Sequence, residues 1–293
     1  MGHLLEQGEK MVLNNEEEAW LRLETLISQE PQFQPLLQLP SLARDENEVT
    51  SGMRDETVQV LRCLKVCFDL PAEVLLLATL SMDRFLTKMR ALRRHLAVIG
   101  VAALHLAAES LRPSSGCPEL SRLAIVSQCG CTAADLARMS GLMQLKLGST
   151  IAATALDFLN AFRSILGLTG PDSSGLEVLA ADSACSNFRP CELALVLLFL
   201  YIDGCPEKVR DSLAKPIGEI YDVCKINENS FWYCYEVVSA SLKQYEERPK
   251  SPHNKQRLVW RLSQRTFRTL RPTSRFDQEL ETILEENLKQ LPD

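Results

Sequence analysis

The sequence lacks the paired cysteines of a zinc module. None of its ten cysteines forms a Cys-x-x-Cys pair, and its four histidines are scattered along the chain. Zinc sites usually place their ligands in pairs at short spacing, so this distribution argues against a metal centre. We therefore expect reduced, mostly buried thiols and no cofactor.

The chain also has no long apolar run. The longest runs, such as LALVLLFLYI at 193–202, are too short to span a bilayer. The acidic N-terminus MGHLLEQGEKMVLNNEEEAW has no apolar signal region, and Glu6 stands where an N-myristoylation motif requires Ser or Thr. These features predict an intracellular protein without a membrane partner.

The chain also has no excess of positive charge. The chain carries 32 Lys and Arg against 38 Asp and Glu, a formal net charge of −6. Nucleic-acid binding needs a basic surface, so we expect no nucleic-acid partner. Residues 246–276 are the exception, with nine Lys or Arg against two Glu. This stretch is either a solvated tail or a docking segment for an acidic partner.

Apolar residues recur at helical spacing, and strand-like alternation is almost absent, so the predicted fold class is all-α. Residues 16–30 predict an amphipathic helix that Pro31 ends, and residues 31–52 predict a linker. Further helices are expected at 54–68, 72–88, 92–111, 119–127, 131–147, 154–166, 176–186, 190–203, 206–214 and 229–245. The final stretch, DQELETILEENLKQLPD, predicts an acidic amphipathic helix.

Several motifs resemble the cyclin box. MRDETVQVL (53–61) and LLLATLSMDRFL (75–86) resemble the family's MR…L opening and its L-x-L-A-x-x-x-x-D-R-F-L second helix. HLAVIGVAALHLAAE (95–109) and LARMSGLMQLKL (136–147) resemble the third and fifth helices, and TALDFL (154–159) the entry into a second box. The resemblance implies a cyclin fold of two five-helix cyclin-box repeats, with an N-terminal helix and a C-terminal tail.

Four further segments are similar to motifs of the atypical G-type cyclins, with the I-type near them. They are EPQFQP (30–35), SQCGCTAADLARM (127–139), CKIN (224–227) and QRLVWRLSQRTFRTL (256–270). On this resemblance the chain divides into an N-terminal helix and linker (1–52), a first cyclin box (53–150), a second, divergent box (151–245), and a basic tail with an acidic C-terminal helix (246–293).

The resemblance implies a regulatory protein that is not an enzyme. Cyclins bind a cyclin-dependent kinase and reposition its αC helix and activation loop. G-type cyclins are associated with protein phosphatase 2A regulatory subunits, with kinases and with growth arrest. We therefore expect a nuclear or cytoplasmic adaptor in cell-cycle or growth-arrest signalling that binds such a subunit, a kinase or both. The alternative is a kinase-activating subunit with an unusual interface. A DNA-binding protein like transcription factor IIB is disfavoured by the acidic pI and the missing cysteine pairs.

The resemblance also assigns a structural ion pair. In cyclins the Arg of the MR motif pairs with the Asp of the DRFL motif. Here these residues are Arg54 and Asp83, which would join the first two helices of the box. Neighbouring helical residues point about 100° apart, so Arg84 is expected to lie toward the surface.

The family's kinase contacts are altered in this sequence. A Lys at the end of the third helix and the Glu of an R-M-E motif in the fifth carry much of that contact. Their positions hold Glu109 and Ser140 here, and neighbouring interface positions hold Ser110, Gly141 and Gln144. Losing one partner of a desolvated, charged hydrogen bond typically costs about 2–5 kcal/mol, so ordinary kinase activation is not expected.

The family's substrate-docking patch is degenerate too. Kinase-activating cyclins bind R-x-L peptides on an M-R-x-x-L-x-x-W surface. Met53 is kept here, but Thr57 replaces the Leu and Val60 replaces the Trp. A shallow patch without its aromatic residue makes a poor hot spot.

Overall fold

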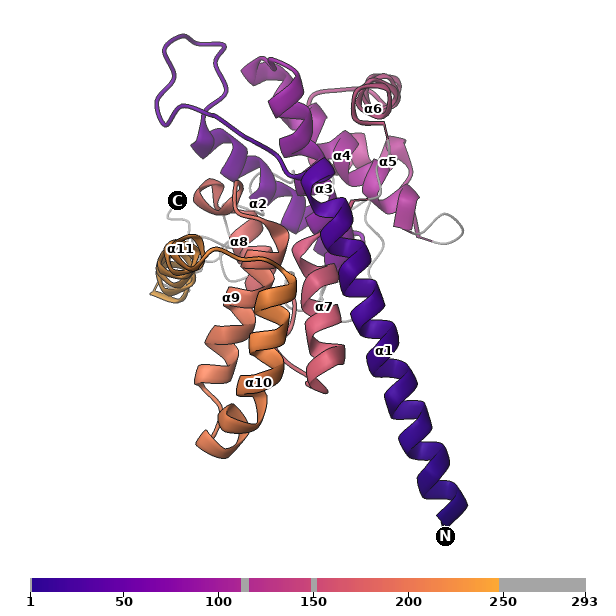
Figure 1. Ribbon diagram of the computed structural model, residues 1–293. Coiled ribbons are helices and arrows are strands. Elements are labelled where there is room, and N and C mark those ends of the chain that lie inside the picture. Colours follow the sequence, from indigo (N-terminus) through magenta and orange to yellow (C-terminus); the bar gives the residue numbers. More distant parts are fainter. Residues whose placement is uncertain (1, 112–115, 149–151, 248–293) are drawn as a thin grey trace, which may run out of the picture. The chain divides into compact units, whose positions relative to one another are not determined.

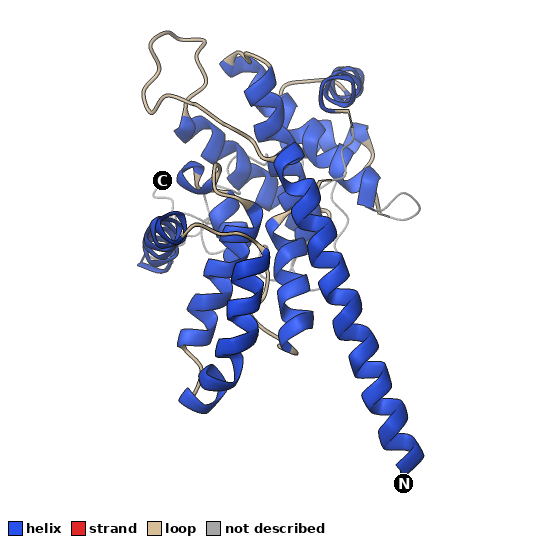
Figure 2. Cartoon of the chain, viewed as in Figure 1, coloured by secondary structure: helices blue, strands red, loops and turns tan. Residues whose placement is uncertain are grey.

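A computed structural model describes the backbone of residues 2–111, 116–148 and 152–247, and their side chains from residue 16 onward. The described residues form helices, turns and loops without a β-strand, which confirms the all-α class (Figure 2). The basic tail and the acidic C-terminal helix predicted beyond residue 247 lie outside the described residues.

The long helix α1 (Gly2–Phe33) precedes two successive sets of five helices (Figure 1). The first set is α2 (Ser51–Cys67), α3 (Ala72–Lys88), α4 (Leu96–Leu111), α5 (Leu120–Ser127) and α6 (Ala133–Leu147). The second set is α7 (Ala155–Leu166), α8 (Ser174–Ala180), α9 (Pro190–Asp203), α10 (Glu207–Val223) and α11 (Glu228–Glu247). The 3₁₀ turn η1 (Arg93–His95) lies between α3 and α4, and the 3₁₀ turn η2 (Ser183–Cys185) lies between α8 and α9. The two predicted five-helix repeats are therefore confirmed.

Helix α4 is the centre of the first repeat. It is apolar on nearly all sides, as expected of a central helix, and it packs against α3 and α6. Gly100 lets α2 come close, because a Cβ atom on Gly100 would lie only 2.7 Å from Cγ2 of Thr57. Thr57, predicted at the degenerate docking patch, therefore packs partly against the core helix.

Helix α1 packs with the second repeat, although it precedes the first repeat in the sequence. Leu23 and Leu26 are buried in the core formed by α7 and α9, and α1 lies beside α7 (Figure 1). The prediction that Pro31 ends this helix is wrong, because the helix continues to Phe33. A proline removes its own amide donor and crowds the carbonyl four residues earlier, but the following turn still closes, because the amide of Gln34 donates to the carbonyl of Glu30 at 3.1 Å.

Two predicted boundaries in the second repeat also need correction. Helix α10 does not end at residue 214 but continues through Pro216 to Val223. Its buried stripe of Leu213, Ile217 and Ile220 continues on both sides of the proline, so packing outweighs the lost hydrogen bond. Helix α8 is shorter than the predicted 176–186 and gives way to the 3₁₀ turn η2.

The ten cysteines are free thiols. The expectation that most are buried is only partly right, since the buried set is Cys185, Cys191, Cys224 and Cys234, and Cys67 is exposed. Burial raises the pKa of the Cys185 thiol to about 12, so this group stays protonated. The described residues contain no cluster of His, Cys, Asp or Glu suited to a metal ion. None of the described helices is both long and apolar enough to cross a membrane.

Candidate protein-binding site

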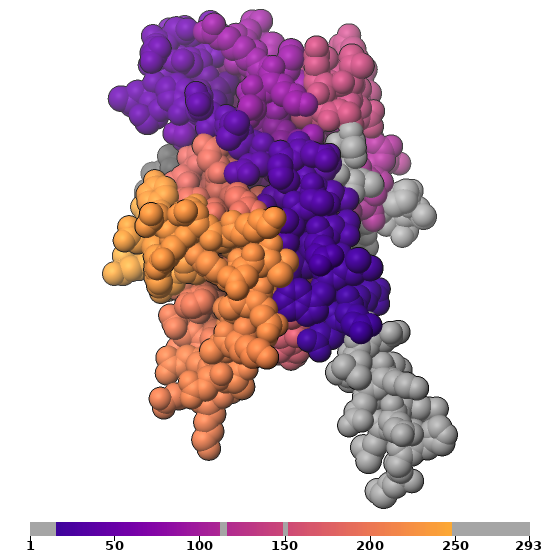
Figure 3. All heavy atoms as spheres, in the orientation of Figure 1, coloured from indigo at the N-terminus to yellow at the C-terminus, as the bar shows by residue number. Residues whose placement is uncertain are grey.

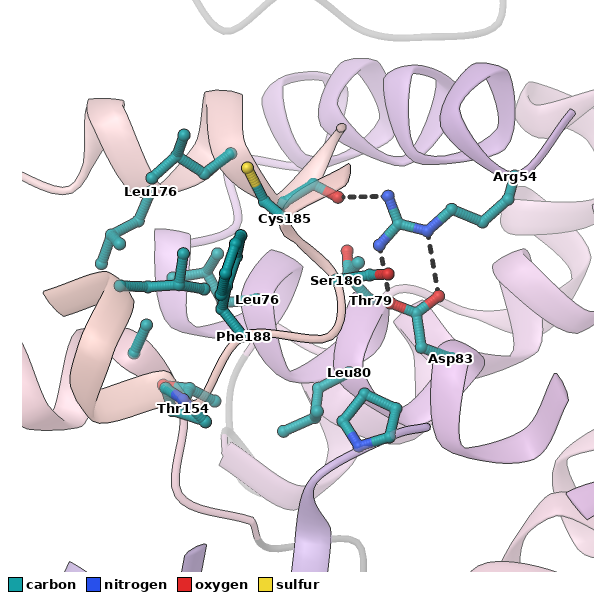
Figure 4. A pocket seen from close by; sticks show the side chains of 16 residues that line it. Arg54, Leu76, Thr79, Leu80, Asp83, Thr154, Leu176, Cys185, Ser186 and Phe188 are labelled. Carbon is teal, nitrogen blue, oxygen red and sulfur yellow. Dashed lines mark hydrogen bonds and ion pairs between the residues drawn. The ribbon is translucent and has the colours of Figure 1, made fainter. Parts of the chain in front are cut away.

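Arg54 on α2 and Asp83 on α3 form a buried, two-point ion pair. The Nε atom of Arg54 donates to Oδ1 of Asp83 at 3.0 Å, and Nη2 donates to Oδ2 at 2.6 Å (Figure 4). The side chains expose only 1% and 4% of their surface. The two residues that the family motifs single out are therefore brought together, and they join α2 to α3.

Arg54 also reaches the second repeat, which the sequence did not reveal. Its Nη1 atom donates to the carbonyl of Ala180 at the end of α8, at 2.7 Å, and to Asp55 at 3.1 Å. Asp55 in turn accepts a hydrogen bond from Ser183 in η2 at 2.9 Å. Burial alone would lower the pKa of Arg54, but the charges and hydrogen bonds of Asp83 and Asp55 outweigh it and raise the pKa. The guanidinium therefore stays charged and connects the two repeats.

Arg84 is buried, so the prediction that it lies toward the surface is wrong. Its Nη2 atom donates to the carbonyl of Leu147 at the end of α6, at 3.3 Å. Its guanidinium also lies over the ring of Phe33, 4.7 Å from the centroid. The C-terminal end of a helix carries partial negative charge, and an aromatic face attracts a cation, so both contacts favour the charge. Burial nevertheless lowers the pKa of Arg84.

Glu30 connects α1 to the start of α9. Its side chain is almost fully buried, and Oε2 accepts from Nε and Nη2 of Arg189 at 2.9 and 2.6 Å. Its Oε1 atom accepts from the amide of Cys191 at 2.8 Å. Helix α9 has no side-chain cap of its own, so Glu30 supplies the acceptor and the negative charge that a helix N-terminus favours.

The residues after Glu30 continue this attachment, and we call residues 30–37 the strap. Gln34 donates through Nε2 to the carbonyl of Asn187 at 3.0 Å. The side-chain amide of Asn187 then exchanges two hydrogen bonds, both 2.8 Å long, with the backbone of Leu37. Atoms of the N-terminal region and of the second repeat meet on the face drawn in Figure 3. The first part of the predicted linker is therefore hydrogen-bonded to Asn187, in the loop before α9.

A small cavity lies where the strap meets the two repeats (Figure 4). Its volume is about 80 Å³, far below the roughly 300–1,000 Å³ of typical small-molecule sites. The two charged groups in its wall, Arg54 and Asp83, already neutralise each other. Most of its other walls are apolar, with Leu76, Leu176 and Phe188 among them. The cavity offers neither an unpaired acid or base nor room for a cofactor.

The positions that the family uses for its kinase lie on α4 and α6. Glu109, Gly141 and Gln144 are exposed, as predicted for an interface. Ser110 is half-buried, and its hydroxyl donates to the carbonyl of Leu106 at 2.8 Å. Ser140 differs, because only 7% of its surface is exposed and its hydroxyl has no hydrogen-bond partner among the described residues. The short Ser140 side chain is therefore buried, and its place in a kinase interface stays a prediction.

Exposed apolar side chains lie on the same helices as these positions and on α5. Leu142 and Leu145 are exposed on α6, on the same side as Gly141 and Gln144, and 79% of Leu145 is exposed. Leu111 at the end of α4 and Ile125 on α5 are also exposed, on helices that pack against α6. We call the set Glu109, Leu111, Ile125, Gly141, Leu142, Gln144 and Leu145 the α4–α6 face. Exposed apolar side chains grouped on adjoining elements are typical of protein-binding surfaces.

The predicted docking patch on α2 presents less exposed side-chain surface than α6 does. Met53, Thr57 and Val60 are all half-buried. The Thr57 hydroxyl donates to the carbonyl of Met53 at 2.8 Å, so it is satisfied within its own helix. No aromatic residue stands at these positions to anchor a peptide.

The comparisons with known proteins agree with this fold. Residues 22–152 match the family described as "Cyclin, N-terminal domain". The viral cyclin of herpesvirus saimiri superposes with a TM-score of 0.55 at 19% identity, over 78% of this chain and 99% of the viral one. The two helical repeats and these similarities define a protein of the cyclin fold.

Two curated relatives refine this class. The chain is 35% identical to Cyclin G of Drosophila melanogaster over 86% of its own length, although the match spans only 49% of that protein. It is 31% identical to human Cyclin-G2, over 90% of this chain and 80% of the human protein. The chain therefore belongs to the cyclin family, among the G-type cyclins.

Proposed function

We propose that the chain is a non-catalytic adaptor in intracellular cell-cycle or growth-arrest signalling. Its partner would be a regulatory subunit of protein phosphatase 2A, and its hold on cyclin-dependent kinases would be weak. The observation that carries the weak kinase binding is the exposed carboxylate of Glu109, at the position where kinase-binding cyclins present a Lys. The similarity to the G-type cyclins supports the phosphatase partner. A carboxylate cannot donate to a kinase carbonyl, and it faces that carbonyl with like partial charge.

The second altered position adds to this effect. A Glu at the position of Ser140 would extend beyond the helix surface, whereas the Ser hydroxyl stays buried. Helices α4 and α6 therefore carry neither charged residue of the family's kinase contact at these two positions. Each lost anchor of this kind costs about 2–5 kcal/mol in binding, so the kinase affinity is expected to fall at least about thirty-fold.

Phosphatase binding is tested by a pull-down with the tagged full-length chain. We expect a regulatory subunit of protein phosphatase 2A to be recovered, and recovery to fall at least about ten-fold when residues 248–293 are deleted. A sharper variant is Leu280→Ala with Ile283→Ala, which removes two apolar positions of the terminal amphipathic stretch, and Thr282→Ala, on the opposite side of that predicted helix, is its control. Recovery of no such subunit by the intact chain would contradict the proposal.

The second candidate is a kinase-activating subunit with an unusual interface. Leu142 and Leu145 favour it, because the exposed α6 still presents apolar contacts in the family's kinase-binding region. Co-expression with a panel of cyclin-dependent kinases separates the candidates through phosphotransfer rates. The adaptor proposal predicts no activity above kinase alone with the natural chain, and activity gained with Glu109→Lys or Glu109→Lys/Ser140→Glu. Activation by the natural chain that Glu109→Lys barely changes would instead establish the second candidate.

A further inference from the structure

The N-terminal half of α11 presents aromatic side chains to solvent. Trp232 is 50% exposed and Tyr233 is 62% exposed. Both rings are held in place: Trp232 packs edge to face against Phe231 and Tyr235, and Tyr233 packs at a tilt against Phe188, with centroids 5.5 to 5.6 Å apart. Rigid, exposed Trp and Tyr side chains lose little conformational entropy on binding, and they dominate binding hot spots.

Carboxylates bracket these rings. Glu228, Trp232 and Glu236 follow one another at four-residue spacing, so the two acids lie one helical turn on either side of the indole. Both acids are exposed. Tyr221 on α10 extends the surface, and its pKa is raised by burial and by the nearby charges of Glu228 and Asp222. The surface is therefore both aromatic and acidic.

Among the described residues, positive charge near this surface is sparse. Arg189 lies at the start of α9, but its guanidinium is already held by the buried Glu30 at 2.6 Å. Lys225, between α10 and α11, is exposed and is outnumbered by Asp222, Glu228 and Glu236.

We infer that this aromatic–acidic surface, made of Tyr221, Glu228, Trp232, Tyr233, Tyr235 and Glu236, docks an arginine- and lysine-rich segment of a partner protein. A guanidinium stacked on the indole would gain a cation–π contact and would lie between two carboxylates. An apolar helix would desolvate Glu228 and Glu236 without pairing them. A second copy of the chain would bring like charges together across a symmetric contact.

The inference is independent of the proposed adaptor function. The surface lies on α10 and α11 in the second repeat, and none of its residues belongs to the α4–α6 face. The two binding activities are therefore separable by mutation.

The test is an anisotropy titration of the full-length chain with three labelled peptides, built from Arg-Gly-Ser, Lys-Gly-Ser and Gln-Gly-Ser repeats. We expect the arginine peptide to bind more tightly than the lysine peptide, the glutamine peptide not to bind, and binding to weaken as salt is added. Trp232→Ala with Tyr233→Ala, and separately Glu228→Lys with Glu236→Lys, should each weaken arginine-peptide binding at least about ten-fold.

A matched control carries the same charge change at exposed sites elsewhere, Glu24→Lys with Glu46→Lys, and should bind almost as well as the natural chain. Equal weakening by the control and the patch variants would overturn the inference, because bulk charge would then explain the binding. Equal binding of the arginine and glutamine peptides would overturn it as well. Sedimentation showing that the patch variants convert a dimer into a monomer would mean that a second copy covers the surface instead.

Discussion

Replacing Glu30 by alanine is expected to destabilise the protein by about 3 kcal/mol. The change leaves the Arg189 guanidinium, which is 27% exposed, without its carboxylate, and leaves the amide of Cys191 without its acceptor. The partial exposure of Arg189 moderates the cost, which for fully buried pairs is about 3–5 kcal/mol. Because the same carboxylate attaches α1 to α9, α1 should also become more susceptible to proteolysis. Urea unfolding of the natural chain and of the Glu30→Ala variant measures the loss of unfolding free energy.

Two further variants show whether the Glu30 carboxylate causes this effect. Glu30→Gln keeps an oxygen that can accept from the Cys191 amide but loses the charge, so its loss should be intermediate. Glu24→Ala removes an exposed acid from the same helix and should change the unfolding free energy by no more than about 0.5 kcal/mol. Equal losses for Glu30→Ala and Glu24→Ala would contradict the proposed capping of α9.

The second large effect is expected at Asp83. Asp83→Ala should cost about 3–5 kcal/mol, because it leaves the buried charge of Arg54 with only the Ala180 carbonyl and Asp55. Arg54→Ala should be similarly damaging on its own. In the Asp83→Ala background it should cost clearly less, because the ion pair is already gone. Thermal and urea unfolding of the four proteins in this cycle measure the coupling.

Glu73→Ala is the control for this cycle. Glu73 is an exposed acid in the first turn of the same helix, α3, and its loss should cost no more than about 1 kcal/mol. Losses that simply add in the Arg54→Ala/Asp83→Ala double variant would mean that the two side chains do not interact. A strong coupling would show that the pair holds α2 against α3 and, through Arg54, against α8.

The sequence predicted the features that rest on repeated local patterns. Helical periodicity gave the fold class, and the MR and DRFL motifs predicted the Arg54–Asp83 pair. The prediction for Arg84 was wrong because its partners are a backbone carbonyl and an aromatic ring. Neither partner is an acidic residue, so no sequence motif indicates them. Pro31 was misjudged because the loss of one amide donor does not prevent the next turn from closing.

The role of the strap could not be predicted from its own residues. Glu30 stands in the quoted EPQFQP motif, but its partner Arg189 lies 159 residues further along the chain. Only the docking of α1 on the second repeat brings the two together. Packing also separates the two altered interface positions that the sequence singled out together. Glu109 is exposed, whereas Ser140 is buried. The domain boundaries and the kinase-facing role of Glu109 stay predictions.

The most direct test of the altered kinase interface is an affinity measurement. The natural chain and the Glu109→Lys variant are each titrated against the same purified cyclin-dependent kinases, with melting temperatures compared to exclude unfolding. Because Glu109 is exposed, the variant should fold normally. We expect at least one kinase to bind the variant about thirty-fold or more tightly than the natural chain. Tight binding of the natural chain, unchanged by the substitution, would contradict the proposal that this cyclin has lost its usual hold on a kinase.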